Sequence, residues 1–193
     1  MSKPERHPAR ATYDDLRRVP PDKVAEIVDG ELTVTPRPAA RHALASSRLG
    51  ADLTAFDRLP GGGGGPGGWC VLDEPEVHLA DDVLVPDLAG WRRERMPQVP
   101  DVPFFTLAPD WVCEVTSPAT RALDRVRKMP IYAREHVGHV WLLDPIDKLL
   151  EVFRLEGQGW LLVSAHEGAV KVRAQPFDAL EIDLGRFWLE GGS

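Results

Sequence analysis

The sequence predicts an α/β fold with a mixed β-sheet in one domain, and three observations support this prediction. The chain has 193 residues and is 43% hydrophobic, which suits one continuous core, because domains of roughly 100–200 residues are the usual size. An Asp-Gly pair at residues 29–30 separates two apolar runs, the strongest short-range signal of a β-hairpin. Two further apolar runs of strand length, 111–116 and 140–144, enclose a segment with a helical pattern.

The first third of the chain predicts a short helix, the hairpin and a longer helix. Residues 1–11 are polar and are expected to be disordered. The pattern Thr-Tyr-Asp-Asp from Thr12 onward is a capping box, so a short helix is expected to run to about Arg18, before two prolines. The hairpin is expected over 24–35. Apolar spacing then predicts an amphipathic helix over 38–59.

A glycine-rich loop and short strands are expected next. Residues 60–68 (PGGGGGPGG) predict a flexible loop. This loop does not match a phosphate-binding loop, because Trp69 follows where Lys and then Ser or Thr are required, and no strand precedes it. Short strands rich in β-branched residues are predicted at 69–72, 76–79 and 83–89. The polar, proline-rich segment 91–103 predicts a further loop.

The second half of the chain is expected to form the centre of the sheet. The run WVCEVT at 111–116 is typical of a central buried strand. Ser117 and Pro118 then supply an N-cap and a proline at the first helical position. Four apolar side chains of the helix that begins there are expected to face the core: Ala122, Leu123, Val126 and Met129.

The last strands are expected to be antiparallel. VWLLD at 140–144 predicts a second buried strand, which Pro145 ends. From about Leu149 to about Leu184, alternating patterns around turns at 157–159 and 168 predict three or four antiparallel strands.

The composition predicts neither a membrane-spanning nor a secreted protein, and it argues against a protein that binds nucleic acid. No apolar run approaches the roughly 18–20 residues of a membrane span, and the charged N-terminus lacks the apolar core of a secretory signal. Cys70 and Cys113 both lie in apolar runs, so we expect two reduced thiols and a cytoplasmic protein. The net charge of -7 is unfavourable for a protein that binds a phosphate backbone. The distribution of charge therefore matters more than its sum.

Two carboxylates stand out because each lies in or at the end of an apolar strand. They are Asp87 in VLVPDLA and Glu114 in WVCEVT. A lone carboxylate in a core strand is costly, so such residues are usually paired, hydrogen-bonded or metal-bound. Two of them on strands that can pair could hold one hard cation, Mg²⁺ or Mn²⁺. The structural alternative is that Asp87 ends a strand and Glu114 pairs with an arginine.

The helix after Glu114 carries a basic face. Arg121, Arg125 and Lys128 fall at i, i+4 and i+7, so they are expected to share one side of the helix. Asp124 precedes Lys128 by four residues and can pair with it. A solvated helix face with ion pairs explains this pattern equally well.

With these motifs, the chain resembles the Uma-type family of restriction endonucleases, a branch of the PD-(D/E)XK superfamily. The resemblance covers residues 12–188 and is most specific between Glu114 and Asp144. It is carried by EIVDGEL, VPDLAGWRRER, WVCEVTSPATRALDRVRK, Tyr132, Val137-Gly138 and VWLLDP. It implies a restriction-endonuclease-like fold: a central mixed β-sheet flanked by helices, with an N-terminal hairpin and extra C-terminal antiparallel strands.

The resemblance also implies roles for particular residues. Asp87 matches the aspartate of the PD half-motif, and Glu114 matches the acidic residue of the second half-motif. The motif would place its lysine at Thr116, and the family resembles nucleases in which that lysine has moved to the next helix, where Lys128 matches it. Pro130, two residues later, is expected to kink or break this helix.

The resemblance also implies which residues would bind the metal and which would bind the substrate. Asp87, Glu114 and the backbone carbonyl of Val115 would hold Mg²⁺ or Mn²⁺, and Lys128 would assist the hydrolysis of a phosphodiester bond in DNA. Arg121 and Arg125 would bind flanking phosphates. A homodimer is implied, since restriction-like folds often dimerise to cut both strands. Glu31 is a possible additional acidic residue near the site, whereas His42 is expected to be a surface residue.

Two rival functions stay open. The same fold could serve as a non-catalytic module that binds nucleic acid or protein, which the acidic balance and Pro130 favour. A zinc hydrolase could instead use Glu135, His136 and His139, although the helical HExxH pattern is absent.

Overall fold

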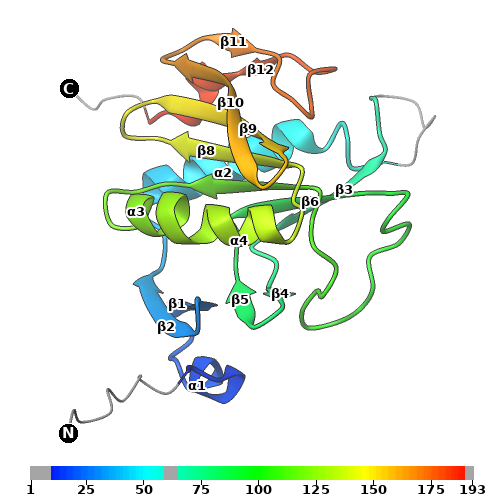
Figure 1. Ribbon diagram of the computed structural model, residues 1–193. Helices are drawn as coiled ribbons and strands as arrows, with labels where there is room; N and C mark the ends of the chain where they lie inside the picture. Colours follow the sequence, from blue (N-terminus) through cyan, green and yellow to red (C-terminus); the bar gives the residue numbers. More distant parts are fainter. Residues whose placement is uncertain (1–9, 59–64, 190–193) are drawn as a thin grey trace, which may run out of the picture.

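The computed structural model describes residues 10–58 and 65–189, and a six-stranded sheet lies at its centre (Figure 1). The strand order is β10-β9-β8-β7-β6-β3. β7 and β8 are parallel and the other neighbours are antiparallel, so the sheet is mixed, as predicted. The strands are β3 (Trp69–Asp73), β6 (Leu88–Arg92), β7 (Trp111–Val115), β8 (His139–Asp144), β9 (Leu149–Glu156) and β10 (Gly159–Glu167).

A second sheet has four strands in the order β2-β1-β5-β4. They are β1 (Lys23–Val28), β2 (Glu31–Pro36), β4 (Val77–Leu79) and β5 (Asp82–Leu84). β1 and β2 form the predicted hairpin. Asp29 and Gly30 both have positive φ, 54° and 78°, as the tight hairpin turn requires of its two central residues.

The strand predicted over 83–89 is wrong as a single unit. β5 ends at Leu84 and β6 begins at Leu88, so the intervening residues cross from one sheet to the other. Pro86 lies in this crossing, where it has no amide hydrogen to donate to a strand ladder. Asp87 is thereby placed at the junction of the two sheets.

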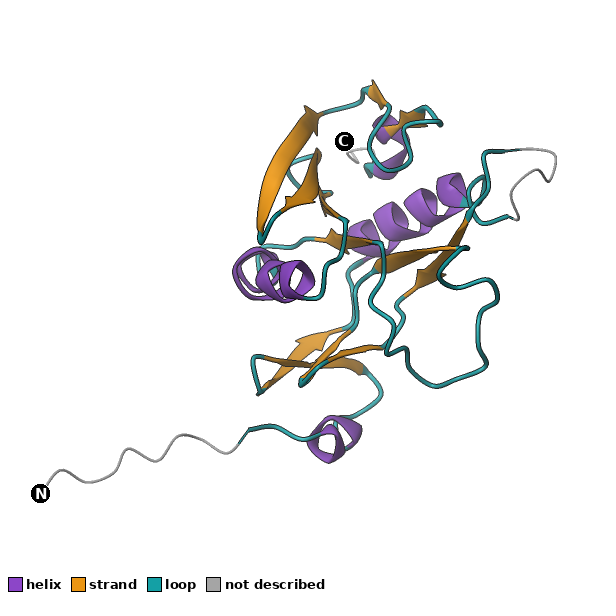
Figure 2. Ribbon diagram, turned by 45° about the vertical axis from the view of Figure 1, so that its right-hand side comes forward, coloured by secondary structure: helices purple, strands orange, loops and turns teal. Residues whose placement is uncertain are grey.

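Two helices precede the central strands. α1 (Tyr13–Arg17) has the predicted capping box at Thr12. α2 (Ala40–Leu53) is shorter than predicted, because Pro38 lies before its first turn and the regular helix ends at Thr54. Its buried face packs on one side of the central sheet, as Figure 2 shows, together with the C-terminal segment. This segment contains β11 (Lys171–Val172), β12 (Ile182–Asp183) and a 3-10 helix, η2 (Leu184–Phe187), so four antiparallel strands follow β8.

The opposite side of the sheet is covered by a helical run of three parts: α3 (Arg121–Leu123), a π-helix η1 (Asp124–Lys128) and α4 (Met129–Arg134). The predicted helix start at Ser117 is wrong. Its side chain does accept a hydrogen bond from the amide of Thr120, but residues 118–120 form a turn. Of the kink or break expected at Pro130, the break is wrong: the helical run continues through Pro130, which lies in the first turn of α4 directly after the π-helix.

The π-helix changes which side chains of this run face the protein. The amide of Met129 donates to the carbonyl of Asp124, five residues back, so this turn holds more residues than an α-turn. Ala122 and Val126, predicted to be buried, are therefore exposed, whereas Asp124 and Lys128 are buried. Met129 is buried and Leu123 is partly buried, as predicted.

Two segments are expected to lack regular structure, the N-terminus (1–11) and the glycine-rich loop (60–68). Residues 1–9 and 59–64 lie outside the described residues. Of the neighbouring positions, the amide of Ala11 donates to the carbonyl of Gly30, and the amide of Gly68 donates to the carbonyl of Arg58.

Cys70 and Cys113 are free and buried, as predicted. Among the described helices, none is long and apolar enough to cross a membrane.

His139, at the start of β8, predicts a pH dependence of stability. Burial lowers its pKa to about 4, with contributions from the charges of Arg92 and Arg154. Between about pH 6.5 and pH 4, His139 is therefore protonated in the unfolded chain but neutral in the folded protein. Stability from this group is complete above that window and is lost as the pH falls through it. His139→Gln is expected to remove about 1–2 kcal/mol of the difference in unfolding free energy between pH 7 and pH 4.5, allowing for partial exposure. Urea unfolding at both pH values checks this, and equal pH dependence in both proteins would contradict it.

Candidate active site

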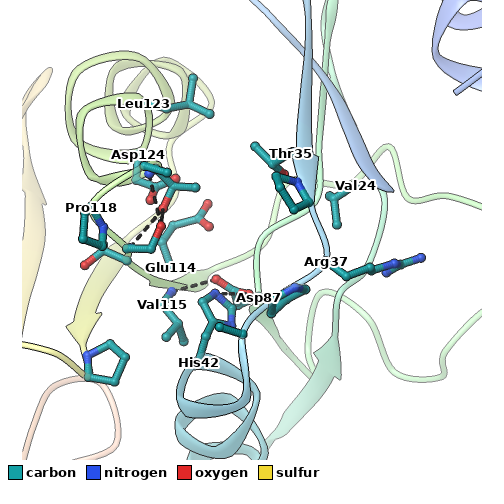
Figure 3. A pocket seen from close by; sticks show the side chains of 18 of the residues that line it. Val24, Thr35, Arg37, His42, Asp87, Glu114, Val115, Pro118, Leu123 and Asp124 are labelled. Atoms are coloured by element: carbon teal, nitrogen blue, oxygen red, sulfur yellow. Dashed lines mark hydrogen bonds and ion pairs between the residues drawn. The ribbon is translucent and has the colours of Figure 1, made fainter. Parts of the chain in front are cut away.

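The two carboxylates singled out in the sequence lie on neighbouring strands. Asp87 directly precedes β6, Glu114 lies in β7, and the register pairs Leu88 with Cys113. Asp87 Oδ2 accepts a hydrogen bond from the amide of Val115 at 2.7 Å. Asp87 and Glu114 line the same cavity (Figure 3). The strand pairing therefore brings the two half-motifs together.

Lys128 joins them through a cluster of buried charges. Its Nζ lies 2.8 Å from Glu26 Oε1, 3.4 Å from both carboxylate oxygens of Glu114 and 3.6 Å from Asp124 Oδ1. All four side chains are only 3–5% exposed. The ion pair predicted between Asp124 and Lys128 is confirmed. One ammonium group thus faces three carboxylates in the interior.

Two further hydrogen bonds fix the orientation of this cluster. The hydroxyl of Tyr132, in α4, donates to Glu114 Oε1 at 2.5 Å. The amide of Val85 donates to Glu26 Oε1 at 2.8 Å. Because Val85 lies in the crossing between the two sheets, this bond connects the hairpin to the segment that leads to Asp87.

The cluster contains three carboxyl groups and one ammonium group, so Lys128 cannot compensate the charge of all three. Burial raises the pKa of Glu114 well above its usual value, although the charge of Lys128 opposes the shift. Burial likewise raises the pKa of Asp124 to about 6. For Lys128, burial acts to lower the pKa, but Glu114, Glu26 and Asp124 together raise it well above the usual value. The lysine therefore stays charged, whereas Glu114 and Asp124 bind protons more readily than exposed carboxyl groups do.

His42 is not the surface residue that was expected. It lies in the first turn of α2, its Nε2 is 3.1 Å from Asp87 Oδ1, and both side chains are 15% exposed. Burial acts to lower the pKa of His42, but the hydrogen bond and charge of Asp87 outweigh it, and the pKa is raised. His42 Nδ1 is buried without a close hydrogen-bond partner. The imidazole thus holds one oxygen of Asp87 while Val115 holds the other.

The cavity above these residues measures about 370 Å³. One wall is the hairpin, with Val24 and Thr35, and the opposite wall is the turn and helix after β7, with Pro118 and Leu123 (Figure 3). Most of the lining surface is apolar, and the buried cluster of Glu26, Glu114, Asp124 and Lys128 also lines the cavity.

Three residues implied by the resemblance lie elsewhere. Glu31 is 66% exposed and pairs with Arg127 at 2.9 Å; Glu26 is the acidic residue of the hairpin that reaches the site. Arg121 pairs with Asp144 and Asp147, and Arg125 pairs with Glu151. None of these three lines the cavity.

The zinc site considered from the sequence has no support in the structure. Over residues 10–58 and 65–189, no group of three or more His, Cys, Asp or Glu side chains is arranged to hold a metal ion. His136 is exposed at the end of α4, whereas His139 is partly buried in β8.

Tyr132 provides a test of how Glu114 is held. Tyr132→Phe removes one hydrogen bond to a buried carboxylate and changes little else in volume. We expect a loss of about 1–3 kcal/mol in unfolding free energy. If Glu114 acts in catalysis, the activity should fall by about 10–100-fold, because partners that orient a ligating side chain have effects of this size. Urea unfolding and a rate assay on the same preparation measure both. An unchanged rate together with lost stability would make Tyr132 purely structural.

Comparisons with known proteins identify the fold and the family of this chain. The fold is similar to the crystal structure of a putative nuclease belonging to DUF820 from Anabaena variabilis, with a TM-score of 0.70 and 19% sequence identity over 92% of this chain and 97% of that one. A search of curated proteins finds no match. The model of the Uma2 family, described as "Putative restriction endonuclease", matches residues 10–185. The chain therefore belongs to the Uma2 family of putative restriction endonucleases.

Proposed function

We propose that this protein is a nuclease that hydrolyses phosphodiester bonds with the help of Mg²⁺ or Mn²⁺. The observation that carries the proposal is the convergence of Asp87, Glu114 and Lys128 on one cavity, in a chain of this family. DNA as the substrate and a homodimer as the assembly belong to the same proposal and rest on the family resemblance.

The chemistry of the donors fits a hard divalent cation. Asp87 and Glu114 offer carboxylate oxygens, which Mg²⁺ and Mn²⁺ prefer, and Glu26 and Asp124 add negative charge nearby. These two residues and Glu114 share Lys128 as their cation, so a divalent cation would offset negative charge that one lysine does not. With two carboxylates in the set, the carbonyl of Val115 and water would complete the shell. A bound ion would lower the pKa of a water molecule and neutralise charge on the scissile phosphate.

The remaining residues would position these groups and stabilise charge. Lys128 already contacts both oxygens of Glu114, so its ammonium group would stand beside a phosphate held at that carboxylate and offset the negative charge of the transition state. His42 and the amide of Val115 each hold one oxygen of Asp87, which fixes the carboxylate in one orientation. Tyr132 does the same for Glu114.

A non-catalytic binding module is the second candidate. It is favoured by the acidic cavity and by Arg121 and Arg125, which are occupied by ion pairs instead of facing it. Titration with Mn²⁺ separates the two functions. An active site of the proposed kind binds the ion saturably and loses that binding in Asp87→Asn, whereas a module without a metal site shows no saturable binding.

The nuclease proposal is tested by incubating negatively supercoiled plasmid DNA, in which supercoiling favours local strand opening, with the purified protein and Mn²⁺ or Mg²⁺. Nicked circles should accumulate with time, and EDTA should stop their formation. Substitutions at the two carboxylates make this test specific for the site.

A further inference from the structure

We infer that the substrate enters this site as an unpaired nucleotide segment, not as an intact duplex. This inference rests on the proposed nuclease function and concerns the form of nucleic acid that the cavity can receive. It follows from the depth, the size and walls, and the charge of the cavity.

The first observation is depth. Glu114 and Lys128 are almost fully buried, and Asp87 is mostly buried, at the floor of the cavity between the hairpin and the helical run. A phosphate must therefore pass between two protein walls to reach them. Phosphates of a duplex are attached to a rigid stack of base pairs, which would have to enter with them. A single strand can bend its backbone into the cavity.

The second observation is the size and character of the cavity. Its volume of about 370 Å³ lies at the lower end of the roughly 300–1,000 Å³ that is typical of small-ligand pockets, so it suits about one nucleotide unit. Its walls are apolar, and four prolines contribute to them: Pro36, Pro38, Pro118 and Pro145. Apolar side chains of this kind can contact a base that has left its stack.

The third observation is charge. The lining contains five carboxylates, Glu26, Glu74, Asp87, Glu114 and Asp124. Its cations are the buried Lys128 and two exposed arginines, Arg37 and Arg41. A duplex-binding surface needs many cations, because each phosphate contact is a charge neutralised. This lining suits contact with one or two phosphates of one strand.

Arg41 is the cation best placed for such a contact. It precedes His42 in the first turn of α2, and its side chain forms no ion pair or hydrogen bond within the part of the chain that the structure describes. Arg37 is partly engaged, since it contacts Glu74 at 3.3 Å and the carbonyl of Pro21 at 3.1 Å. We therefore assign Arg41 to a phosphate next to the one at the carboxylates.

The test uses one fluorescent oligonucleotide in three forms: single-stranded, fully paired, and paired except for a central loop. DNA and RNA versions of each form distinguish the two sugars. Binding is measured by anisotropy in Ca²⁺, and cleavage is mapped in Mn²⁺. We expect the unpaired forms to bind at least about tenfold more tightly than the duplex, because a duplex must first be opened, and cuts should fall within the unpaired segment.

Salt dependence and one variant sharpen the test. Two phosphate contacts on a single strand predict a slope of log K against log salt of about -1.4, at about -0.7 each. Arg41→Gln should halve this slope. Lys171→Gln is the matched control, because it removes one exposed charge in β11, at the other end of the molecule from the hairpin (Figure 1), and should leave the slope unchanged.

The outcomes separate this inference from the nuclease proposal. A preference for unpaired forms in binding without cleavage of any form would uphold the inference and refute the nuclease function. Equal binding and cleavage of the duplex would overturn the inference and leave the nuclease function standing. Binding to none of the forms, or a slope that Arg41→Gln leaves intact, also counts against it.

Discussion

Asp87→Asn and Glu114→Gln are each expected to lower the rate of Mn²⁺-dependent plasmid nicking by on the order of 10³-fold, the upper range for removing one group that stabilises transition-state charge. Both replacements keep the shape of the side chain. The amide oxygen of Asn can still accept from Val115, and that of Gln can still accept from Tyr132. What is lost is the negative charge that a divalent cation requires.

The stability of these variants keeps the result interpretable. Because burial raises the pKa of Glu114, replacing its carboxylate by a neutral amide should not weaken the fold, and the unfolding midpoint is expected to stay level or rise. Glu31→Gln is the matched control, because Glu31 is an exposed carboxylate of the β1–β2 hairpin that pairs with Arg127 outside the cavity. It should nick plasmid at the parent rate. The assignment of the site fails if Asp87→Asn and Glu114→Gln cut as fast as Glu31→Gln.

The elements of the fold that could be predicted from sequence are those fixed by local patterns. The Asp29-Gly30 turn, the capping box at Thr12 and the buried run that contains Glu114 each depend on neighbours in the chain. The pairing that brings Asp87 beside Glu114 was accessible by a different argument. A carboxylate in an apolar strand needs a partner, and the two strands could supply one to each other.

The same argument would have found Glu26, which lies in the apolar run VAEIV of the hairpin and is buried in β1. Its contact with Lys128 joins a strand of the second sheet to the helical run, however, and no local pattern encodes how these two elements come together. Which side chains of the helical run face inward could not be predicted from the local pattern either. A regular 3.6-residue repeat puts Val126 inside, whereas the π-helix at Asp124–Lys128 exposes it and turns the lysine toward the carboxylates.

Lys128→Met is expected to cause the largest loss of stability, about 3–5 kcal/mol at pH 8, the usual cost of removing one partner from a buried ion pair. The Met side chain has a similar length but leaves Glu26, Glu114 and Asp124 buried without a cation. Lys171→Met, at an exposed lysine that pairs with Glu181, is the control and should change stability by less than about 1 kcal/mol.

The loss in Lys128→Met should also depend on pH and on metal. Without the lysine, Glu114 and Asp124 lose the largest effect that opposes burial, and their pKa values are raised even in the parent protein. A carboxyl whose pKa is raised on folding stabilises the fold while it is protonated and loses that contribution as the pH rises through the folded pKa. The variant should therefore unfold at a higher urea concentration at pH 5 than at pH 8, and Mn²⁺ should recover part of the loss at pH 8. If its unfolding free energy at pH 8 matches that of Lys171→Met, the three carboxylates do not depend on this ammonium group for their charge balance.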